Sequence, residues 1–198
     1  MLWDVPRVSE EHLNARREQI LDAARACFVA KGLHSTSMQD LIKEAGLSVG
    51  AVYRYFKSKD EIIAAIAETV TGGIMQHIET VAAQRLPLAE SMDAVLVAIE
   101  IQMGPGGHLP IALQVWAEAA IDPAIAAIAK DRYVKLRGAL QLLVENAVDS
   151  GELPEDTDVA AVTSAYYSLV PGFALQRMLT GTPDKDSYMR GLRLLINR

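Results

Sequence analysis

Five side chains between residues 53 and 59 are of types that recognise nucleic acids. The sequence there reads Y-R-Y-F-K-S-K, and the first acidic residue that follows is Asp60. Arginine can pair with base edges, whereas lysine and tyrosine side chains donate hydrogen bonds to phosphate oxygens. A solvated helix surface can have the same composition, because short basic clusters are common on helices. Which of these two interpretations applies depends on the helices that position these side chains.

Residues 35–60 predict two short helices joined by a tight turn. Thr36 and Ser37 are both good N-caps, each with a capping-box partner three residues later, so the first helix can begin after either of them. Gly46 supplies the left-handed conformation that commonly ends a helix, and Ser48 can cap a second helix two residues later. This arrangement has the layout of a helix-turn-helix motif.

The second of these helices is suited to approach DNA. Its first turn, residues 48–51, is small, so its N-terminal end can come close to base edges and offer backbone N–H groups to a phosphate. Val52 and Phe56 must pack inward, which leaves the basic and tyrosine side chains partly or wholly exposed. The caps, the Gly46 turn and the basic end together favour DNA binding over a solvated surface.

At this point the sequence resembles a known family. Residues 15–32, A-R-R-E-Q-I-L-D-A-A-R-A-C-F-V-A-K-G, and the segment T-S-M-Q-D-L-I-K-E-A-G-L-S-V-G-A-V-Y-R-Y-F-K-S-K-D-E-I that begins at Thr36 are similar to the DNA-binding domain of the TetR family of bacterial transcriptional regulators. The resemblance implies a three-helix DNA-binding domain, a larger helical effector domain, and a homodimer that loses affinity for its operator when a small molecule binds.

The resemblance also implies roles for individual residues. By position, Thr36, Tyr53, Tyr55 and Lys59 would hold phosphates, while Val49, Gly50 and Arg54 would face bases. Val49 and Gly50 offer little hydrogen-bonding capacity, so the resemblance does not fix the operator sequence. The candidate DNA-binding residues are Thr36, Ser37, Ser48, Val49, Gly50, Ala51, Tyr53, Arg54, Tyr55, Lys57 and Lys59.

Length and charge fit this interpretation. A chain of 198 residues, 51% hydrophobic and 22% charged, can bury a core as one domain or as a small domain beside a larger one. Residues 1–62 contain nine Lys or Arg and nine Asp or Glu, whereas residues 63–198 contain ten and sixteen. The net charge of −6 therefore lies in the second part, and an acidic body would direct DNA toward the locally basic end.

Cysteine usage and the N-terminus indicate a soluble, cytoplasmic protein. Cys27 is the single cysteine, so no intrachain disulfide can form, and its helical stripe with Phe28 predicts a core position rather than a reactive thiol. Residues 1–7 lack the order of a signal peptide, and no apolar run approaches the ~18 residues of a membrane span. Either a disordered tail or a minor-groove contact by Arg7 fits this first segment.

A long helix is predicted to follow the motif and to connect two parts of the chain. Ser58 caps it with Glu61 as capping-box partner, and apolar residues continue the helical rhythm toward Leu86. Gly72 and Gly73 lie in its middle, where each costs roughly 1 kcal/mol of helix stability relative to alanine. A bend or a close backbone approach would explain this pair structurally, and space for a ligand would explain it functionally.

The rest of the chain also predicts helices. Their expected ranges are 88–103, 110–121, 123–149, a segment from Thr157 or Asp158 to Gly181, and 186–197. No internal repeat or strand-like alternation occurs in the sequence. We therefore expect an all-α protein of about nine helices. Residues 1–62 would form the helix-turn-helix domain, joined by the long helix to an effector-binding and dimerisation domain at residues 63–198.

Catalytic and metal sites are not indicated. The four histidines are scattered, and the sequence has no H-E-x-x-H or G-x-S-x-G motif and no Cys/His spacing suited to zinc. Glu100 and Glu118 lie in apolar helices and could meet in space, but a ligand's polar anchor or a surface position explains them more simply. We expect neither an enzyme nor a cofactor.

Aromatic and methionine residues of the second domain are candidates for an effector pocket, because such linings suit adaptable, mostly apolar ligands. The same residues would also fit a plain helical core. The candidates are Met103, Trp116, Tyr166, Phe173 and Met178, with Gln102, Gln114 or Glu118 as polar anchor. A ligand there would act on the motif through Gly72 and Gly73 of the connecting helix.

Reading a palindrome requires two recognition helices about 34–36 Å apart, and hence a two-fold dimer. Small residues on one helix and apolar residues on the last one are candidates for a four-helix interface, although these helices would also cap the monomer's core. The candidates are Ala161, Ala165, Ser168 and Gly172 with Tyr188, Leu192 and Leu195.

Three hypotheses follow. A ligand-responsive repressor predicts a palindromic operator and a large apolar cavity in the second domain. A DNA-binding protein without effector control predicts the operator alone. A binding module or enzyme on the same fold predicts neither an operator nor salt-dependent DNA affinity, and we favour the first hypothesis.

Overall fold

The computed structural model describes residues 10–104 and 106–196, so the proposed Arg7 contact lies outside the described residues. Within them the chain forms nine α-helices and no strand, which confirms the all-α prediction for this part of the chain. In order they are α1 (Glu10–Lys31), α2 (Met38–Ala45), α3 (Val49–Tyr55), α4 (Lys59–Ala83), α5 (Leu88–Met103), α6 (Leu109–Ala119), α7 (Pro123–Asp149), α8 (Val159–Thr180) and α9 (Lys185–Ile196).

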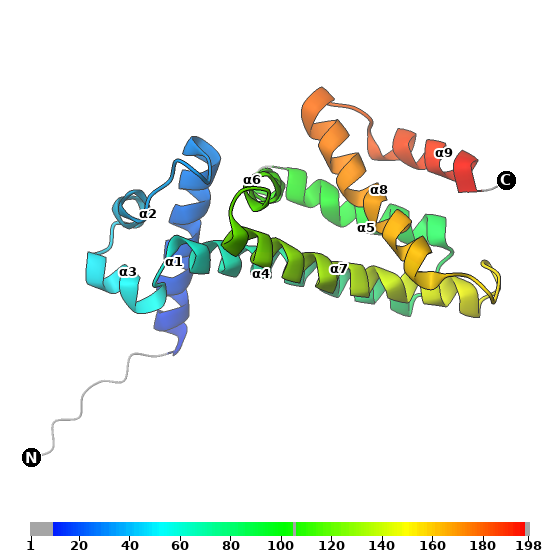
Figure 1. Ribbon diagram of the computed structural model, residues 1–198, viewed down its shortest axis with the longest axis horizontal. Helices are drawn as coiled ribbons and strands as arrows, with labels where there is room; N and C mark the ends of the chain where they lie inside the picture. The colour runs from blue at the N-terminus through cyan, green and yellow to red at the C-terminus, as the bar shows by residue number, and fades with distance from the viewer. Residues whose placement is uncertain (1–9, 105, 197–198) are drawn as a thin grey trace, which may run out of the picture.

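Helices α1, α2 and α3 form a small domain at one end of the molecule (Figure 1). Of the two candidate caps, Ser37 caps α2: its hydroxyl accepts from the N–H of Asp40, whose carboxylate accepts from the N–H of Ser37. Gly46 ends α2 with a φ of 64°, which glycine adopts without strain. Ser48 then caps α3 by accepting from the N–H of Ala51.

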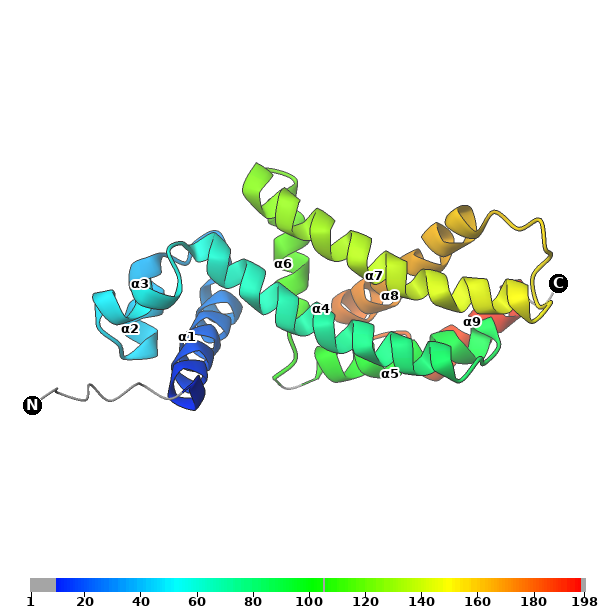
Figure 2. The same ribbon diagram turned by 90° about the horizontal axis from the view of Figure 1, so that it is seen from below.

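Helix α4 runs from the small domain into the larger one (Figure 2). Ser58 caps it as predicted by accepting from the N–H of Glu61, but the Glu61 carboxylate accepts from the N–H of Lys57 and does not complete a capping box. The helix ends before the expected boundary, because Arg85 has a φ of 49° that a right-handed helix does not accommodate.

Gly72 and Gly73 lie within the unbroken helix α4. Both are exposed, and a Cβ atom built on either would meet no atom within 4 Å. Neither a close backbone approach nor space for a ligand therefore accounts for the pair. The remaining explanation is an effect on helix α4 itself, because glycine makes a helix easier to bend or to unwind.

The larger domain contains most of α4 together with α5 to α9 (Figures 1 and 2). Helix α4 packs on α7 and α5, α8 packs on α7 and α5, and α9 packs on α5. Its core is formed by buried side chains from these helices, including Met92, Leu96, Val144 and Phe173.

A second hydrophobic cluster fills the small domain and extends beyond it. It contains residues of α1 to α3 and of the first turns of α4, and also Ile111 and Val115 of α6 and Ile125 of α7. The expected boundary at residues 62 and 63 thus falls within a helix and within a continuous core. As a result, α6 packs against both parts of the chain.

Candidate functional site

Helix α3 packs one face inward and presents the other to solvent. Val52 and Phe56 are buried in the small core, as predicted. On the other face, 59% of the surface of Val49 is exposed. The exposed side consists of Ser48, Val49, Gly50, Tyr53, Arg54 and Lys57, with Ala51 and Tyr55 half-buried. An exposed helix with an arginine between two tyrosines and no acid has the groups needed to enter a major groove.

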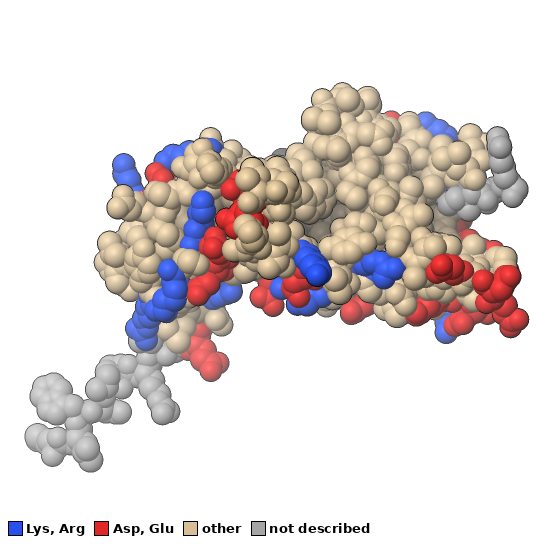
Figure 3. Space-filling model, viewed as in Figure 1, with Lys and Arg blue, Asp and Glu red and all other residues tan. Residues whose placement is uncertain are grey.

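The surface charges differ between the two ends of the molecule (Figure 3). Lys and Arg side chains are interspersed with acidic ones on the small domain, whereas acidic side chains gather at the far end of the larger domain. These exposed acids lie at the end of α7 and in the connection to α8: Asp149, Glu152, Glu155, Asp156 and Asp158. This distribution agrees with the charge asymmetry of the sequence, and an acidic end is expected to repel DNA.

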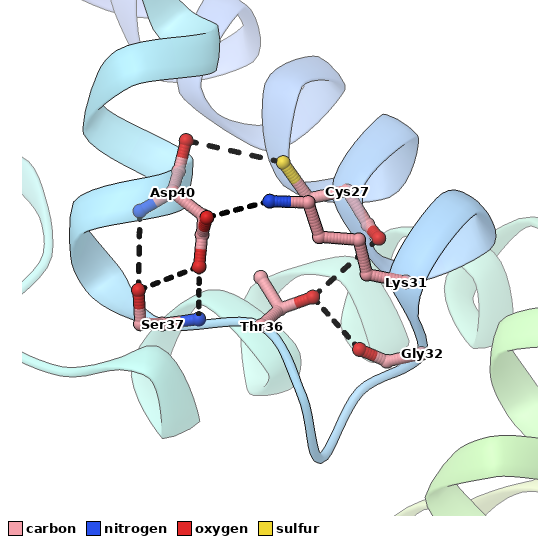
Figure 4. A network of polar contacts seen from close by, with 6 residues as sticks. All are labelled: Cys27, Lys31, Gly32, Thr36, Ser37 and Asp40. Carbon is pink, nitrogen blue, oxygen red and sulfur yellow. Dashed lines mark hydrogen bonds and ion pairs between the residues drawn. The ribbon is translucent and has the colours of Figure 1, made fainter.

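Thr36 does not face solvent. Only 2% of its surface is exposed, and its hydroxyl donates to the carbonyl of Gly32 at 2.7 Å (Figure 4). The phosphate contact implied by the resemblance is therefore not available to this side chain, because it is turned into the junction between α1 and α2. The neighbouring Ser37 is exposed, but its hydroxyl is hydrogen-bonded to the Asp40 carboxylate.

Asp40 joins α1 to α2 through a polar network (Figure 4). Its carboxylate accepts from the Lys31 ammonium at 2.6 Å and from the N–H and hydroxyl of Ser37. The hydrogen bond from Lys31, and then those from Ser37, hold the pKa of Asp40 well below its ordinary value. Cys27 lies buried beside this network, and burial is the main cause of its raised pKa. Its position in the core is as predicted.

Lys59 has a structural role at the start of α4. Its ammonium donates to the carbonyl of Leu33 at 3.0 Å and to that of Thr36 at 3.1 Å, which holds the α1–α2 loop against α4. Because an ammonium has three donors, one remains for a phosphate. Lys57 is more exposed than Lys59, and its ammonium donates to the carbonyl of Tyr53.

An apolar cavity of about 120 Å³ lies in the larger domain between α4, α5, α6, α7 and α8. Helix α4 contributes a stripe at helical spacing, and α6 contributes aliphatic residues and Trp116. The main lining residues of α4 and α6 are Ile66, Val70, Ile74, Ile78, Ile111, Ala112, Val115 and Trp116, and the polar ones on other elements are Gln102, His108, Arg132, Tyr133 and Tyr167. Such a cavity suits a mostly apolar ligand with few polar contacts.

Of the predicted effector residues, Gln102 and Trp116 line this cavity. Tyr166 and Phe173 instead belong to the core of the larger domain, where the Tyr166 hydroxyl donates to the carbonyl of Leu88 at 2.8 Å. Met103 packs against the same core, and Met178 lies partly exposed on α8. The prediction that these four residues line the pocket is corrected. Aromatic and methionine side chains occur both in helical cores and in pockets, so the residue type alone does not distinguish the two.

Gln114 and Glu118 lie on a different side of α6, against the small domain. The amide oxygen of Gln114 accepts from the N–H of Leu33 at 2.7 Å, and its amide nitrogen donates to the carbonyl of Phe28 at 3.1 Å. The carboxylate of Glu118 lies 3.1 Å from Nδ1 of His34. The prediction that either residue anchors an effector is therefore corrected: both connect α6 to the end of α1 and its following loop.

Sequence reasoning missed most of the cavity wall. The apolar stripe of α4, which includes Ile66, Val70 and Ile74, is the one signal that indicated a buried face there. Arg132 and Tyr167 gave no signal, since single charged or tyrosine residues in a helix are ordinarily at the surface or in the core.

The predicted dimer residues divide into two groups. Leu192 is only 7% exposed and lies in the core of the larger domain, so its assignment to an interface is corrected; Gly172 is half-buried near Tyr188. Tyr188 is half-buried, and its hydroxyl donates to the carbonyl of Leu169 at 2.9 Å. The other four candidates, Ala161, Ala165, Ser168 and Leu195, are exposed. Exposed leucines continue their surface: Leu175, Leu179 and Leu194.

The described residues form neither a cluster suited to a metal ion nor a helix suited to span a membrane. No group of three or more His, Cys, Asp or Glu side chains lies there in an arrangement that could hold a metal ion. None of the helices in residues 10–104 and 106–196 is both long enough and apolar enough to cross a membrane.

Comparisons with known proteins agree with this architecture. A family model described as "Bacterial regulatory proteins, tetR family" matches residues 20–66, and one described as "BetI-type transcriptional repressor, C-terminal" matches residues 107–196. The HTH-type transcriptional regulator UidR of Escherichia coli is 26% identical over 184 residues, which cover 91% of this chain and 90% of UidR.

Solved structures share the fold. GusR of Salmonella enterica superposes with a TM-score of 0.73 at 23% identity, covering 96% of this chain and 97% of GusR. FadR of Bacillus subtilis, solved in complex with stearoyl-CoA, superposes with a TM-score of 0.75 at 19% identity, covering 90% of this chain and 96% of FadR. One family model matches the small domain and the other matches the second half of the chain, and the chain therefore belongs to the TetR family of helix-turn-helix transcriptional regulators.

Proposed function

We propose that this regulator represses transcription by binding a palindromic operator as a homodimer, and that a small, largely apolar effector in the cavity releases it. One observation carries the proposal: the cavity and the core of the small domain share residues. Ile63, Ile66, Ile111 and Val115 line the cavity and also belong to the hydrophobic cluster that supports α3. A ligand that displaces these side chains has to disturb the packing that positions the DNA-binding helix.

Helix α6 offers a second route for the same signal. One side of it lines the cavity through Ala112 and Trp116, and another side holds the α1–α2 loop through Gln114. The same loop is bound by Lys59 at the start of α4. An effector that shifts α6 would therefore shift the loop that precedes the helix-turn-helix, and coupling of roughly 1–3 kcal/mol between the two sites would be usual.

On DNA, we assign base recognition to Arg54 and the positioning of α3 to phosphate contacts from Tyr53, Tyr55 and Lys57. The small residues Val49, Gly50 and Ala51 allow the helix to enter the groove closely, and Lys59 supports the loop while keeping one donor for a phosphate. In this proposal residues 1–62 form the DNA-binding domain and residues 63–198 the effector and dimerisation domain.

The dimer would form through the exposed face of α8 and the end of α9. Along α8 the exposed or half-exposed positions 161, 165, 168, 172, 175 and 179 repeat every three or four residues, as in a helix-packing seam. On these two helices Leu175, Leu179 and Leu195 are 44%, 74% and 77% exposed. Apolar side chains that gather on one surface indicate a protein–protein contact, whereas an isolated exposed one does not. We infer an isologous interface between these helices of two protomers.

The alternative hypotheses explain less. A DNA-binding protein without effector control has no need of an apolar cavity at its domain junction, and an enzyme or binding module has no need of the exposed α3 face. The stearoyl-CoA complex of FadR, whose fold this chain shares, supports a small-molecule effector. We infer no enzymatic activity, and we place the protein in the bacterial cytoplasm with the DNA that it binds.

Gel shifts with the intergenic DNA beside the gene test the proposal. Arg54→Ala should cost roughly 1–3 kcal/mol of operator binding and relax specificity, because a base contact is lost. The matched control is Lys57→Ala on the same helix end, which should weaken all DNA similarly and lower the salt slope by about one. Specific binding that survives the loss of both side chains would exclude α3 as the recognition helix.

A further inference from the structure

The described residues that line the cavity include positively chargeable side chains but no acidic ones. Arg132 of α7 and His108 are the described lining residues that can carry a positive charge, and no Asp or Glu is among the described residues that line it. Burial, followed by the nearby Arg25, lowers the pKa of His108 below its ordinary value of about 6.5, so this imidazole is neutral at pH 7. Among the described lining residues, Arg132 therefore carries the one formal charge at that pH.

The guanidinium of Arg132 is also incompletely bonded. Its Nη2 lies 2.5 Å from the Asp131 carboxylate, but its Nε is buried and has no hydrogen-bond partner among the described residues. Asp131 is exposed, does not line the cavity, and is shared with Lys135 at 3.1 Å. A buried donor without an acceptor is costly, which makes an acceptor supplied by a ligand favourable. Arg25 also has a buried, unpaired Nε, but it does not line the cavity.

The size of the cavity limits the remainder of the ligand. Its volume of about 120 Å³ is close to that of the roughly 150 Å³ cavity that accommodates benzene in an engineered protein core. Tyr133 and Tyr167, which also line it, meet edge to face with ring centroids 4.8 Å apart. These walls fit one ring or a short aliphatic chain.

We propose that the effector is a small amphipathic carboxylate, whose carboxylate group pairs with Arg132 while its ring or short chain fills the apolar cavity. This inference rests on the proposed control by an effector and specifies its chemical class. A planar guanidinium binds a carboxylate through charge-assisted hydrogen bonds, whereas a cationic ligand would meet Arg132 without any acidic partner. Neutral ligands without an acceptor would fill the hydrocarbon part of the cavity but leave the buried Nε of Arg132 without a hydrogen-bond partner among the described residues.

A panel of matched ligands tests the inference on the full-length protein. The probes are the carboxylates from butanoate to octanoate, benzoate and phenylacetate, each compared with its primary amide and primary amine. Binding is followed by Trp116 fluorescence in a Trp3→Phe background and by calorimetry. We expect the best carboxylate to bind at least about tenfold more tightly than its amide or amine, as charge-assisted hydrogen bonds are roughly twice as strong as neutral ones.

Variants of α7 identify the residue responsible. Arg132→Gln should reduce the preference for carboxylate over amide to about one while hydrocarbon binding persists, and Arg132→Lys should keep part of the preference. Lys135→Gln is the matched control, because it removes a positive charge and an Asp131 partner outside the cavity. It should leave the preference unchanged. Unchanged helix content and operator binding show that each variant is folded.

Three results would overturn the inference: no carboxylate of the panel binds, amides or amines bind as tightly, or the preference survives in Arg132→Gln. Its failure is distinguishable from that of the proposed function. If amides or amines bind and release the operator, effector control stands and the carboxylate assignment falls. If the protein without ligand fails to bind operator DNA, the proposed function falls, whereas a carboxylate preference that depends on Arg132 still supports the cavity assignment.

Discussion

The exposed helix α3 and the apolar cavity of the larger domain are built in different ways. The exposed groups of α3 come from one short segment. Its direction is set by local features, namely Gly46 at the end of α2 and the N-cap Ser48 at the start of α3. The cavity is assembled from five helices, whose lining residues extend from Ile63 to Ala174. The first site depends mainly on local contacts, whereas the second depends on how distant helices pack. Substitutions should therefore act locally in the first region and spread through the packing of the second.

The junction of the two regions lies at the α1–α2 loop. Lys59 holds this loop from the side of α4, and Gln114 holds it from the side of α6. In the proposed function, a change in cavity packing would reach the helix-turn-helix motif through these contacts.

The largest expected effect comes from breaking the proposed dimer in the larger domain. Leu179→Arg places a charge in the α8 face, which should yield monomers of unchanged helix content. A palindrome bound by two linked modules gains about 10²–10⁴ in affinity over one module, so operator affinity should fall by a factor in that range. Light scattering and gel shifts measure the two quantities.

Ile121→Arg is the matched control for that substitution. Ile121 is 79% exposed, comparable to the 74% of Leu179, but it lies between α6 and α7, away from the α8 face. It should leave the protein dimeric and bound to its operator. Dimers that persist in Leu179→Arg and in Leu195→Arg would place the interface elsewhere.

A smaller effect is expected at the junction. Gln114→Ala leaves the N–H of Leu33 without its acceptor, while the carbonyl of Phe28 keeps the N–H of Gly32 as donor. We expect a loss of roughly 1–3 kcal/mol in stability and faster hydrogen exchange at the Leu33 amide. Glu118→Ala, the control, breaks only the exposed contact to His34 and should change both quantities less. Equal losses in the two variants would contradict the role given to Gln114.

The sequence predicted the motif well because its signals are local. The left-handed Gly46, the serine at position 48 and the inward positions of Val52 and Phe56 all act within a few residues. The choice between Thr36 and Ser37 as cap was open, because it depends on the Thr36 hydroxyl bonding to Gly32 at the end of α1. That contact requires the tertiary placement of α1.

The cavity was harder to predict for the same reason. Tyr166 and Tyr167 are adjacent in sequence and alike in type, yet one belongs to the core and the other lines the cavity. Which of the two tyrosines faces the cavity depends on the orientation of α8 about its axis where it packs against α5 and α7. Leu192 and Leu195 differ in the same way, because only Leu192 faces α5 and the core.

A modest effect is expected from the glycines of the connecting helix. Gly72→Ala and Gly73→Ala should each stabilise the protein by about 0.4–1 kcal/mol, because alanine meets open space at both positions and restricts the unfolded chain. Denaturant unfolding measures the change, and slower amide exchange in α4 should accompany it. Gly138→Ala in α7, also in open space, is a control that should stabilise without slowing exchange in α4 specifically.

The smallest expected effect tests the local network of the motif through pH. The pKa of Asp40 is depressed in the folded state by Lys31 and Ser37, so its contribution to stability is present above the ordinary carboxyl pKa of about 3.9 and is lost as pH falls toward the folded value. Asp40→Asn should therefore lower the melting temperature slightly at pH 7, and the gap to the wild type should narrow below about pH 4. Asp60→Asn removes a carboxylate from the first turn of α4 and controls for net charge. If the gap stays constant between pH 7 and pH 3, Asp40 acts through its hydrogen bonds as the capping-box partner of Ser37 and not through its charge.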